Sequence, residues 1–391
     1  MKNFAVLGLG LMGKAICYDL LNFTVDNMVY GFELSEERIE QVEEEFSSFK
    51  DRFSGRKLDL QINETVENES LVSELKKLDV KVVFGAIDYK FNEYLTKVCI
   101  TAGCSFLDLG GNPDIVQKQQ KLYKEAEQAN VTIIPDLGLA PGMADIIAAS
   151  IMEKMSSVEQ CHIRVGGLPQ NPKTILKYQQ VFSIRGLTNE YLEDCIVIRD
   201  GKVTTVGGLT ELEELTFPEP WGKLEAFQTS GGTSNLPQIY NGKIKELTYK
   251  TIRFPGHCQF FKFLKDFELL ESNKFLGSKF SPREVIEYFL VKHLPRNDPD
   301  AVLVRITVTG IKNGKKIKIT SDLIDLYDSE SNYSSMARTT AFPTSIIGQM
   351  IMNKTIHTQG VLYGEINVPY SLFKEELAKR KINFSEKEES L

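Results

Sequence analysis

The sequence has few of the features that mark disulfide-stabilised or membrane proteins. Its 391 residues contain six cysteines that never approach C-x-x-C spacing, so neither a disulfide framework nor a cysteine-based metal site is expected. The longest apolar stretch, residues 131–152, contains Pro135, Asp136, Pro141 and Asp145, which a bilayer span would not tolerate well. We therefore expect reduced thiols, a cytoplasmic protein and no membrane partner.

Long stretches of one charge sign are also absent. Lys and Arg number 46 against 53 Asp and Glu, a net charge of −7, and the two signs are interleaved. A nucleic-acid or anionic-membrane partner is therefore not expected. Glycines interrupt the N-terminal apolar run MKNFAVLGLG and no A-x-A site follows, so we expect no signal peptide. With 42% apolar and 25% charged residues, the chain is long enough for two or three domains with cores.

Short β-rich runs alternate with helix-period segments from residue 3 to about 135. This alternation predicts parallel strands joined by right-handed crossovers, hence an α/β fold with a doubly wound Rossmann sheet. The expected strand runs are 4–7, 28–33, 58–62, 81–87, 105–111 and 131–138.

Longer alternating runs begin at about residue 157 and predict a mainly antiparallel sheet in a second α/β domain. Asp200-Gly201 and Asn313-Gly314 interrupt two of these runs, and such dipeptides are typical of two-residue hairpin turns. A further strand run is expected at 178–184, helices are expected at 257–270, 282–294 and 343–352, and the polar end of the chain is expected to fray.

These patterns divide the chain into two domains. The first is a Rossmann NAD-binding domain of residues 1–140, completed by about 337–391. The second, residues 141–336, is expected to bind substrate and to carry dimer contacts.

A glycine motif follows the first expected strand. Gly8, Gly10 and Gly13 fit G-x-G-x-x-G, and an amphipathic helix starts within the motif, with Leu11 and Met12 in its first turn. In this context glycines allow a tight turn and close approach of the backbone to a pyrophosphate, which the helix N-terminus can bind. The alternative is a glycine-rich turn that binds no ligand.

An acidic residue lies at the end of the second expected strand. Glu33 follows Gly13 by twenty residues, where a carboxylate can accept hydrogen bonds from both ribose hydroxyls of NAD and repels a 2′-phosphate. Since no arginine occurs before Arg38, the sequence favours NAD over NADP.

Eight segments in order along the chain resemble the saccharopine dehydrogenase-like reductases, and within them the lysine 6-dehydrogenases. The resemblance implies a Rossmann domain, a second α/β domain with substrate and dimer contacts, a homodimer or higher homo-oligomer, and oxidation of an amine carbon by a pyridine nucleotide. The segments are GLGLMGK (8–14), DLGG (108–111), PDLGLAPG (135–142), RVGGLPQNP (164–172), GLTNEY (186–191), TSGGTSNLP (229–237), KTIRFPGH (250–257) and ARTTAFP (337–343).

Two aspartates are acid/base candidates. Asp108 and Asp136 lie just past the carboxyl ends of expected parallel strands, the edge where open α/β sheets bind ligands. In the resemblance their loops border the nicotinamide, which also makes Ala86, Gly110 and Ala140 candidate cofactor contacts. The alternative role of each aspartate is to cap the following helix.

An amino-acid substrate requires a partner for its carboxylate, and the planar fork of arginine provides a bidentate one. Arg253 lies four residues before His257, between an expected strand and a helix start, so we expect both to face a cleft, His257 as a third acid/base candidate. Alternatively, Arg253 is a surface residue and His257 merely begins a helix.

Four further residues are candidates for the expected substrate site. Thr233 belongs to a hydroxyl-rich turn that could bind a carboxylate or carbonyl, although an ordinary loop would look similar. Tyr191 could line the pocket or belong to the core. Arg185 and Arg164 are weaker rivals of Arg253. No side-chain cluster has metal-ligand spacing, so no metal is expected.

Three functions remain open. The first is NAD-dependent oxidative deamination of the ε-amino group of L-lysine to 2-aminoadipate 6-semialdehyde. The second is a saccharopine- or carboxynorspermidine-type reductase that joins an amine to a carbonyl acid and reduces the imine. The third is a nucleotide sensor without turnover. In all cases the expected partner is a small molecule, an amine or amino acid for the enzymes.

Overall fold

The computed structural model describes residues 3–60, 67–275 and 277–391. The chain forms two compact units. The first contains Met1–Ile147 and Ala337–Ile382, and the second contains Ala148–Met336 and Asn383–Leu391. Within the described residues no helix is both long and apolar enough to span a bilayer.

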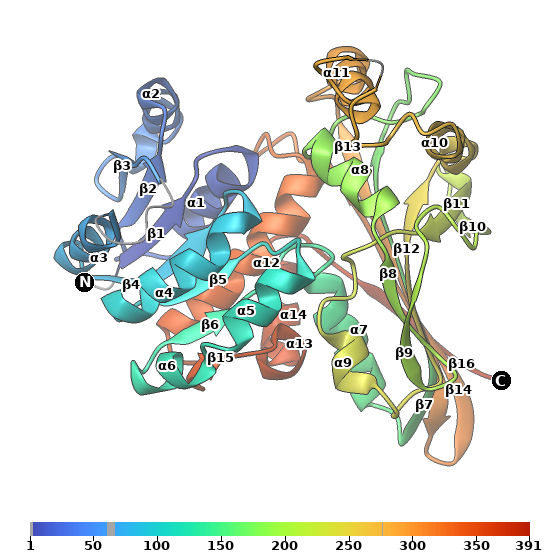
Figure 1. Ribbon diagram of the computed structural model, residues 1–391. Coiled ribbons are helices and arrows are strands. Elements are labelled where there is room, and N and C mark those ends of the chain that lie inside the picture. The colour runs from blue at the N-terminus through green and yellow to red at the C-terminus, as the bar shows by residue number, and fades with distance from the viewer. Residues whose placement is uncertain (1–2, 61–66, 276) are drawn as a thin grey trace. The chain divides into compact units, whose positions relative to one another are not determined.

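A parallel sheet forms the centre of the first unit (Figure 1), in the order β15-β6-β5-β4-β1-β2-β3. The order β3-β2-β1-β4-β5-β6 is that of a doubly wound dinucleotide-binding sheet, so the predicted Rossmann fold is confirmed. Apart from β3, its strands are short and largely apolar because both faces of the sheet are covered. The strands are β1 (Asn3–Leu7), β2 (Val29–Glu33), β3 (Phe53–Lys57), β4 (Val80–Gly85), β5 (Ser105–Asp108), β6 (Thr132–Ile134) and β15 (Gly360–Val361).

Helices cover both faces of this sheet. Apolar residues of α3, α4 and α6 form one core with alternate residues of β1, β4, β5 and β6. On the other face α12 packs so closely that a Cβ on Gly348 would meet the ring of Phe84. The helices are α1 (Leu11–Phe23), α2 (Glu36–Glu45), α3 (Glu67–Lys77), α4 (Asn92–Ala102), α5 (Pro113–Gln120), α6 (Tyr123–Gln128), α12 (Ser335–Met352), α13 (Gly364–Asn367) and α14 (Tyr370–Lys379), with α7 (Met143–Glu153) divided between the units and 3-10 turns at Ser47–Phe49 and Tyr89–Phe91.

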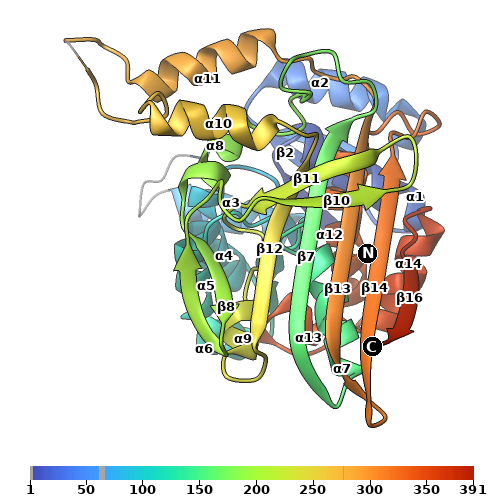
Figure 2. The ribbon, with the colours of Figure 1, turned by 90° about the vertical axis from the view of Figure 1, so that its right-hand side faces the viewer.

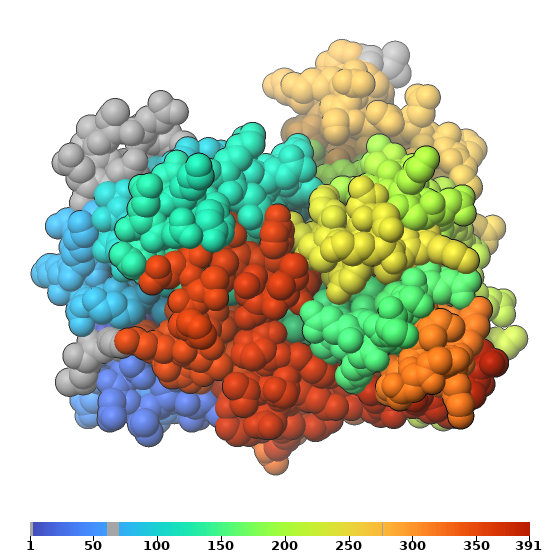
Figure 3. Space-filling view, turned by 90° about the horizontal axis from the view of Figure 1, so that it is seen from below, coloured from blue at the N-terminus to red at the C-terminus, as the bar shows by residue number. Residues whose placement is uncertain are grey.

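The C-terminal part of the chain returns to complete the first unit. Strand β15 pairs with β6, and in Figure 3 the orange-red C-terminal segment lies against the teal segment that contains α5 and α6. A fully buried ion pair fixes this return, because Arg380 binds both carboxylate oxygens of Asp19 on α1, at 2.7 and 3.0 Å. Gln349 of α12 also donates to Asp19, at 3.1 Å. The pair therefore joins α1, α12 and the end of α14.

A mixed sheet with long strands forms the second unit (Figure 2), in the order β10-β11-β12-β7-β13-β14-β16 with the β8–β9 hairpin attached through β12. Only β12 and β7 pair in parallel among the described strands, so the prediction of a mainly antiparallel sheet is confirmed. The strands are β7 (Ser157–Pro169), β8 (Cys195–Arg199), β9 (Lys202–Val206), β10 (Glu213–Phe217), β11 (Gly222–Gln228), β12 (Glu246–Arg253), β13 (Asp300–Lys312), β14 (Lys315–Leu326) and β16 (Ser385–Ser390).

Both predicted hairpins are present. Asp200-Gly201 joins β8 to β9 and Asn313-Gly314 joins β13 to β14, with positive φ at all four residues. Helices α10 and α11 lie at one end of the sheet (Figure 2), and Ser281 forms the predicted cap of α11 as a complete capping box. The helices of this unit are α8 (Ile184–Leu192), α9 (Leu236–Tyr240), α10 (His257–Asp266) and α11 (Pro282–His293).

Three sequence expectations about local structure are wrong. The third Rossmann strand is Phe53–Lys57, not 58–62, and residues 61–62 lie outside the described residues. Of the run 178–184, residues 178–183 form a loop with one isolated bridge, and Ile184 begins α8. The polar end of the chain forms β16, which pairs with β14, so residues 383–391 belong to the second unit instead of completing the first.

Candidate functional site

The glycine motif forms the tight strand-to-helix turn that a dinucleotide requires. Gly8 has φ of 91°, and a Cβ on Gly13 would overlap the carbonyl oxygen of Gly8, so both positions need glycine. Gly10 is the N-cap of α1 and makes no side-chain cap, and a Cβ added there would meet open space. The first amide groups of α1, from Leu11 and Met12, are thus available for a phosphate.

Glu33 lies beside this turn, at the carboxyl end of β2. Its carboxylate accepts hydrogen bonds from the backbone N–H groups of Leu9 (2.9 Å) and Leu34 (2.8 Å). These bonds hold the acidic group next to the glycine turn, where the sequence places the adenosine ribose. Ala86, at the end of β4, lies against Gly8 and Gly13 and completes the walls of the turn.

Asp108 is fully buried at the carboxyl end of β5. Its Oδ1 accepts from the backbone N–H of Gly110 (2.8 Å) and of Asp136 (3.3 Å), and its Oδ2 accepts from the Gln119 side chain (2.7 Å). Burial raises the pKa of Asp108 to about 6, against the effect of these three hydrogen bonds. Because both oxygens are engaged inside the unit, the geometry favours a loop-holding role for Asp108 over a proton-transfer role.

Asp136 lies in the neighbouring loop, after β6. Its backbone is left-handed, with φ of 61°, and its Oδ1 accepts from the N–H of Gly111 at 3.3 Å. A Cβ on Gly110 would collide with Asp136, which explains glycine there. The cis peptide between Ala140 and Pro141 follows in the same loop. Asp108, Asp136, Gly110 and Ala140 thus share the two loops at the carboxyl edge of the sheet.

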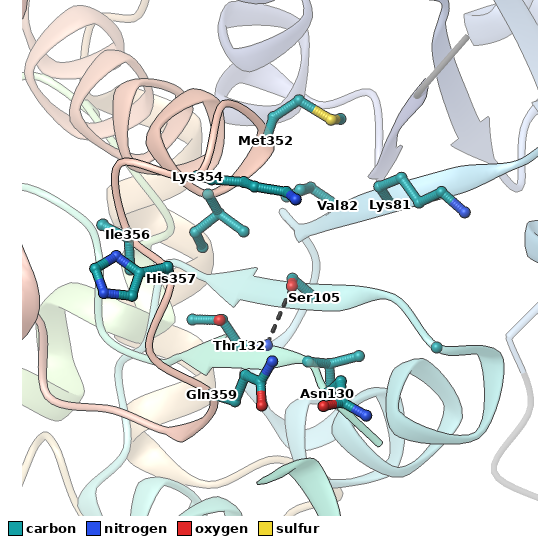
Figure 4. Close-up of a pocket in the computed structure, with 13 residues that line it drawn as sticks. Lys81, Val82, Ser105, Asn130, Thr132, Met352, Lys354, Ile356, His357 and Gln359 are labelled. Carbon is teal, nitrogen blue, oxygen red and sulfur yellow. Dashed lines mark hydrogen bonds between the residues drawn. The ribbon is translucent and has the colours of Figure 1, made fainter. Parts of the chain in front are cut away.

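A cavity of about 440 Å³ lies at the opposite edge of this sheet (Figure 4). Lys81, Ser105 and Thr132 line it from the first residues of β4, β5 and β6, and Lys354 and His357 line it from the segment after α12. Open α/β sheets bind nucleotides at the carboxyl ends of their strands. The cavity is at the amino ends and is therefore not the nucleotide site.

In the second unit, Arg253 is the last residue of β12 and is buried, with 3% exposure. Its Nε donates to the Tyr191 hydroxyl (3.1 Å), one Nη1 hydrogen goes to the Ile252 carbonyl (2.9 Å), and its guanidinium lies 5.0 Å from the Tyr178 ring centroid. No carboxylate of the described residues lies within 4.0 Å of it. The three remaining N–H groups of a buried cation thus lack protein partners, as expected of an anion site.

His257 lies in an aromatic cage beside this arginine. Its Nδ1 bonds to the Leu176 carbonyl at 3.0 Å and its Nε2 to the Tyr191 hydroxyl at 2.9 Å. Since a carbonyl only accepts, Nδ1 carries the proton and Nε2 accepts from tyrosine. Burial and Arg253 lower the pKa of His257 to about 3. Both nitrogens of a neutral ring are therefore engaged, which favours a positioning role for His257 over the expected acid/base role.

The turn from β12 to α10 holds these residues in place. Gly256 is the N-cap of α10 with φ of 97°, and the buried Glu225 on β11 accepts from the N–H groups of Gly256 (2.9 Å) and Cys258 (2.7 Å). A carboxylate at a helix N-terminus satisfies unpaired amides and interacts well with the helix dipole. Glu225 thereby fixes the distance between Arg253 and His257.

Of the remaining predicted substrate residues, Tyr191 belongs to the Arg253 cluster, and Thr233 lies in a loop that contacts α8. Tyr191 is fully buried between Arg253 and His257, so it joins the cluster and also belongs to the core. Thr233 is buried in the loop after β11, whose Ser230 N–H donates to the Glu190 carbonyl at 2.9 Å.

The two weaker arginine candidates lie elsewhere. The side chain of Arg185 is 54% exposed and pairs with Glu287 of α11 at 3.2 Å, so it braces α8 against α11. Arg164 is buried in an ion pair with Glu213 and also donates to the Thr248 carbonyl, so its guanidinium supports the sheet. Neither arginine belongs to the Arg253 cluster.

Two residues of the cluster had not been singled out from the sequence. Tyr178 is buried, and its ring centroid lies 5.0 Å from the Arg253 guanidinium. Glu190, which directly precedes Tyr191 on α8, interacts electrostatically with Arg253. Glu190 stands in the GLTNEY segment, but its neighbour Arg253 is 63 residues away in the chain. Only the fold shows that the two charges are close.

Comparison with known proteins places the chain in a family. A family profile described as the saccharopine dehydrogenase C-terminal domain matches residues 138–382, more than half of the chain. The protein therefore belongs to the saccharopine dehydrogenase-like family, which confirms the resemblance seen in the sequence.

Two curated relatives match the chain at low identity and over part of their own length. The mitochondrial alpha-aminoadipic semialdehyde synthase of Rattus norvegicus is 23% identical over 77% of this chain and 40% of its own length. The saccharopine dehydrogenase [NADP(+), L-glutamate-forming] of Pyricularia oryzae is 24% identical over 60% of this chain and 53% of its own length. The chain thus spans about half the length of the curated relatives that it matches.

A solved structure confirms the fold. The saccharopine dehydrogenase (L-Glu forming) of Saccharomyces cerevisiae superposes with a TM-score of 0.82 at 19% identity, and each chain is covered completely. At this identity the likeness supports the architecture of a Rossmann sheet followed by a second sheet, and nothing finer.

Proposed function

We propose that the protein is a NAD-dependent oxidoreductase that deaminates the ε-amino group of L-lysine to 2-aminoadipate 6-semialdehyde. The observation that carries the proposal is the buried Arg253 guanidinium, with three N–H groups that lack a partner among the described residues. A bidentate carboxylate satisfies such a fork, and amino acids supply one. Membership of a family named after an amino-acid dehydrogenase supports the same substrate class.

The residues of the first unit fit a nicotinamide dinucleotide. The glycine turn and the amides of α1 suit its pyrophosphate, and Glu33 suits the adenosine ribose. When bound, the cofactor supplies the hydride acceptor. The Glu33 carboxylate favours NAD, because a 2′-phosphate would meet a negative charge, although one relative bears NADP(+) in its name.

The substrate nitrogen must lose a proton before hydride can leave its carbon, since an ammonium has no lone pair and titrates near ~10.4 in water. Asp136 lies at the same sheet edge as Asp108 and is 7% exposed, whereas Asp108 is fully buried, so we assign this proton transfer to Asp136. Water then adds to the imine carbon and ammonia leaves. In balance, the lysine cation, water and NAD⁺ give the semialdehyde, ammonium, NADH and one proton.

The second candidate is a saccharopine- or carboxynorspermidine-type reductase, in which an amine and a carbonyl acid form an imine that is then reduced. The relatives named saccharopine dehydrogenase favour it. A sensor that binds the nucleotide without turnover is the lesser alternative. In each case we keep the prediction of a homodimer or higher homo-oligomer.

A direct assay separates these functions. NADH absorbance is followed after the protein is mixed with NAD and either L-lysine, saccharopine or a panel of diamines, and NADPH oxidation is followed with L-lysine and 2-oxo acids. The proposal expects NADH formation that requires L-lysine alone. Turnover only with saccharopine, or only in the reductive direction with a 2-oxo acid, would establish the second candidate instead.

A further inference from the structure

We propose that Glu190 and Arg253 together form a receptor for the head group of an α-amino acid, in which Arg253 binds the α-carboxylate and Glu190 binds the α-ammonium. The proposal deepens the proposed function and rests on it for the choice of L-lysine as the probe. Its new element is a specificity role for Glu190.

Glu190 interacts electrostatically with the Arg253 cation, but no ion pair joins the two side chains among the described residues. Glu190 follows Thr188 and Asn189 on α8, both of which bind Arg283 through their side chains, so this helix is anchored. Arg253 interacts electrostatically with Glu190, yet within the described part of the chain no ion pair joins them at 4.0 Å or less. Because the two charges interact without forming an ion pair, the ammonium and carboxylate of an α-amino acid can each bind one of them.

Both groups have binding capacity that the protein does not use. The Glu190 carboxylate accepts no hydrogen bond from any described residue, although its backbone carbonyl accepts from Ser230. Glu190 is half-buried, whereas Arg253 is 3% exposed, so Glu190 is the more accessible residue of the two. A partly buried carboxylate that accepts no hydrogen bond from the protein can accept them from a ligand.

The surroundings of Glu190 allow only a limited class of ligand. The charged and titratable groups that face it are Arg253 from β12, Glu193 from the end of its own helix, and the hydroxyls of Tyr178 and Tyr191. The two charges match the two opposite charges on adjacent atoms of an α-amino acid. A simple carboxylic acid or a simple amine satisfies only one of them.

The test measures direct binding, so that it does not depend on turnover. L-lysine and 6-aminohexanoate, which lacks the α-amino group, are titrated into the protein by calorimetry. The fluorescence of Trp221, the single tryptophan, gives a second readout, because its ring lies 6.4 Å from that of Phe254, next to Arg253. The wild type should prefer L-lysine by roughly 10- to 100-fold, the value of one charge-assisted hydrogen bond.

The matched variants are Glu190→Gln and Glu214→Gln. Glu190→Gln keeps the shape of the side chain and should reduce the preference to roughly 2-fold, by weakening L-lysine and not 6-aminohexanoate. Glu214 is an exposed carboxylate on β10, 82% exposed, so its variant should keep the wild-type preference. A thermal unfolding scan of each variant verifies that it is folded.

The wild-type protein provides a second measurement if Glu190→Gln does not fold. Burial raises the pKa of Glu190 to about 7, with Arg253 opposing and Glu193 adding to the shift. The carboxylate is therefore charged above pH 7 and neutral below it, so the preference of the wild type for L-lysine should rise between pH 6 and pH 8, and a preference that stays constant over this range would overturn the role of Glu190.

The possible results separate this inference from the proposed function. Equal binding of the two probes by the wild type, or a preference that Glu190→Gln retains, overturns the role of Glu190 and leaves lysine oxidation standing. Selective binding of L-lysine without NADH formation supports the receptor and refutes the proposed reaction. Failure of both probes to bind overturns both.

Discussion

Replacing Arg253 should weaken substrate binding far more than it slows turnover. The guanidinium retains three N–H groups toward an incoming carboxylate, enough for a bidentate pair. Two charge-assisted hydrogen bonds of about 1.5–3 kcal/mol each correspond to a rise in KM for L-lysine on the order of 10² to 10⁴ in Arg253→Met. Because the α-carboxylate is remote from the reacting carbon, kcat should change little.

Two further variants show whether geometry or charge is responsible. Arg253→Lys keeps the charge and loses the planar fork, so its KM should lie between the wild type and Arg253→Met. Arg185→Met removes another arginine of the second unit, one with a side chain that is 54% exposed. The KM of this variant for L-lysine should stay within about 2-fold of the wild type.

The assay is initial-rate kinetics of NADH formation at varied L-lysine, with a thermal unfolding scan of each variant. The scan is needed because Arg253→Met also removes donors from Tyr191 and the Ile252 carbonyl. An unchanged KM in folded Arg253→Met would refute the reasoning, and so would an equal rise in Arg185→Met.

Four other variants test the remaining parts of the site and the fold. Asp136→Asn should lower kcat by on the order of 10² to 10⁴, with partial recovery at high pH, whereas Asp108→Asn should chiefly lower the unfolding temperature; near-normal turnover of Asp136→Asn at neutral pH would rule out this base. Glu33→Ala should weaken NAD binding by roughly 1.5–3 kcal/mol and narrow the preference over NADP, measured by cofactor titration, and a tenfold preference of the wild type for NADP would contradict its placement. Arg380→Met should destabilise the protein by about 3–5 kcal/mol, because it leaves the buried charge of Asp19 unpaired, and an unchanged denaturant midpoint would argue against the ion pair.

Local signals predicted the parts of the fold that depend on local chemistry. The glycine turn after β1 and the two hairpins were predicted correctly because each requires positive φ or a close backbone approach at particular residues. The N-cap of α11 was predicted for the same reason, since Ser281 satisfies amides within its own first turn.

The failures concern elements that depend on distant partners. β3 has little apolar character, FSGRK, and forms a strand because it pairs with β2 along its whole length, whereas residues 58–60 after it lie outside the strand. The end of the chain, SEKEES, has the composition of a frayed tail, yet β14 provides the backbone partners that make it a strand. Tertiary pairing outweighs β-propensity in both.

The candidate site also depends in part on contacts between distant segments of the chain. The sequence paired Arg253 with His257 and named Tyr191 separately as a candidate pocket residue, and the structure places the three in one hydrogen-bonded chain. The sequence could not show that His257 uses both ring nitrogens inside the protein, or that Glu190 interacts with Arg253. Both facts depend on contacts between α8, β12 and a loop.

The central claim is that hydride leaves the ε-carbon of an amino acid whose head group the protein binds. L-lysine carrying deuterium on its ε-carbon tests it most directly, with mass spectrometry of the reduced cofactor and measurement of released ammonia. One deuterium is expected in the reduced NAD for each ammonia released. Reduced cofactor without deuterium, or no reduction with L-lysine under conditions in which saccharopine is oxidised, would contradict it.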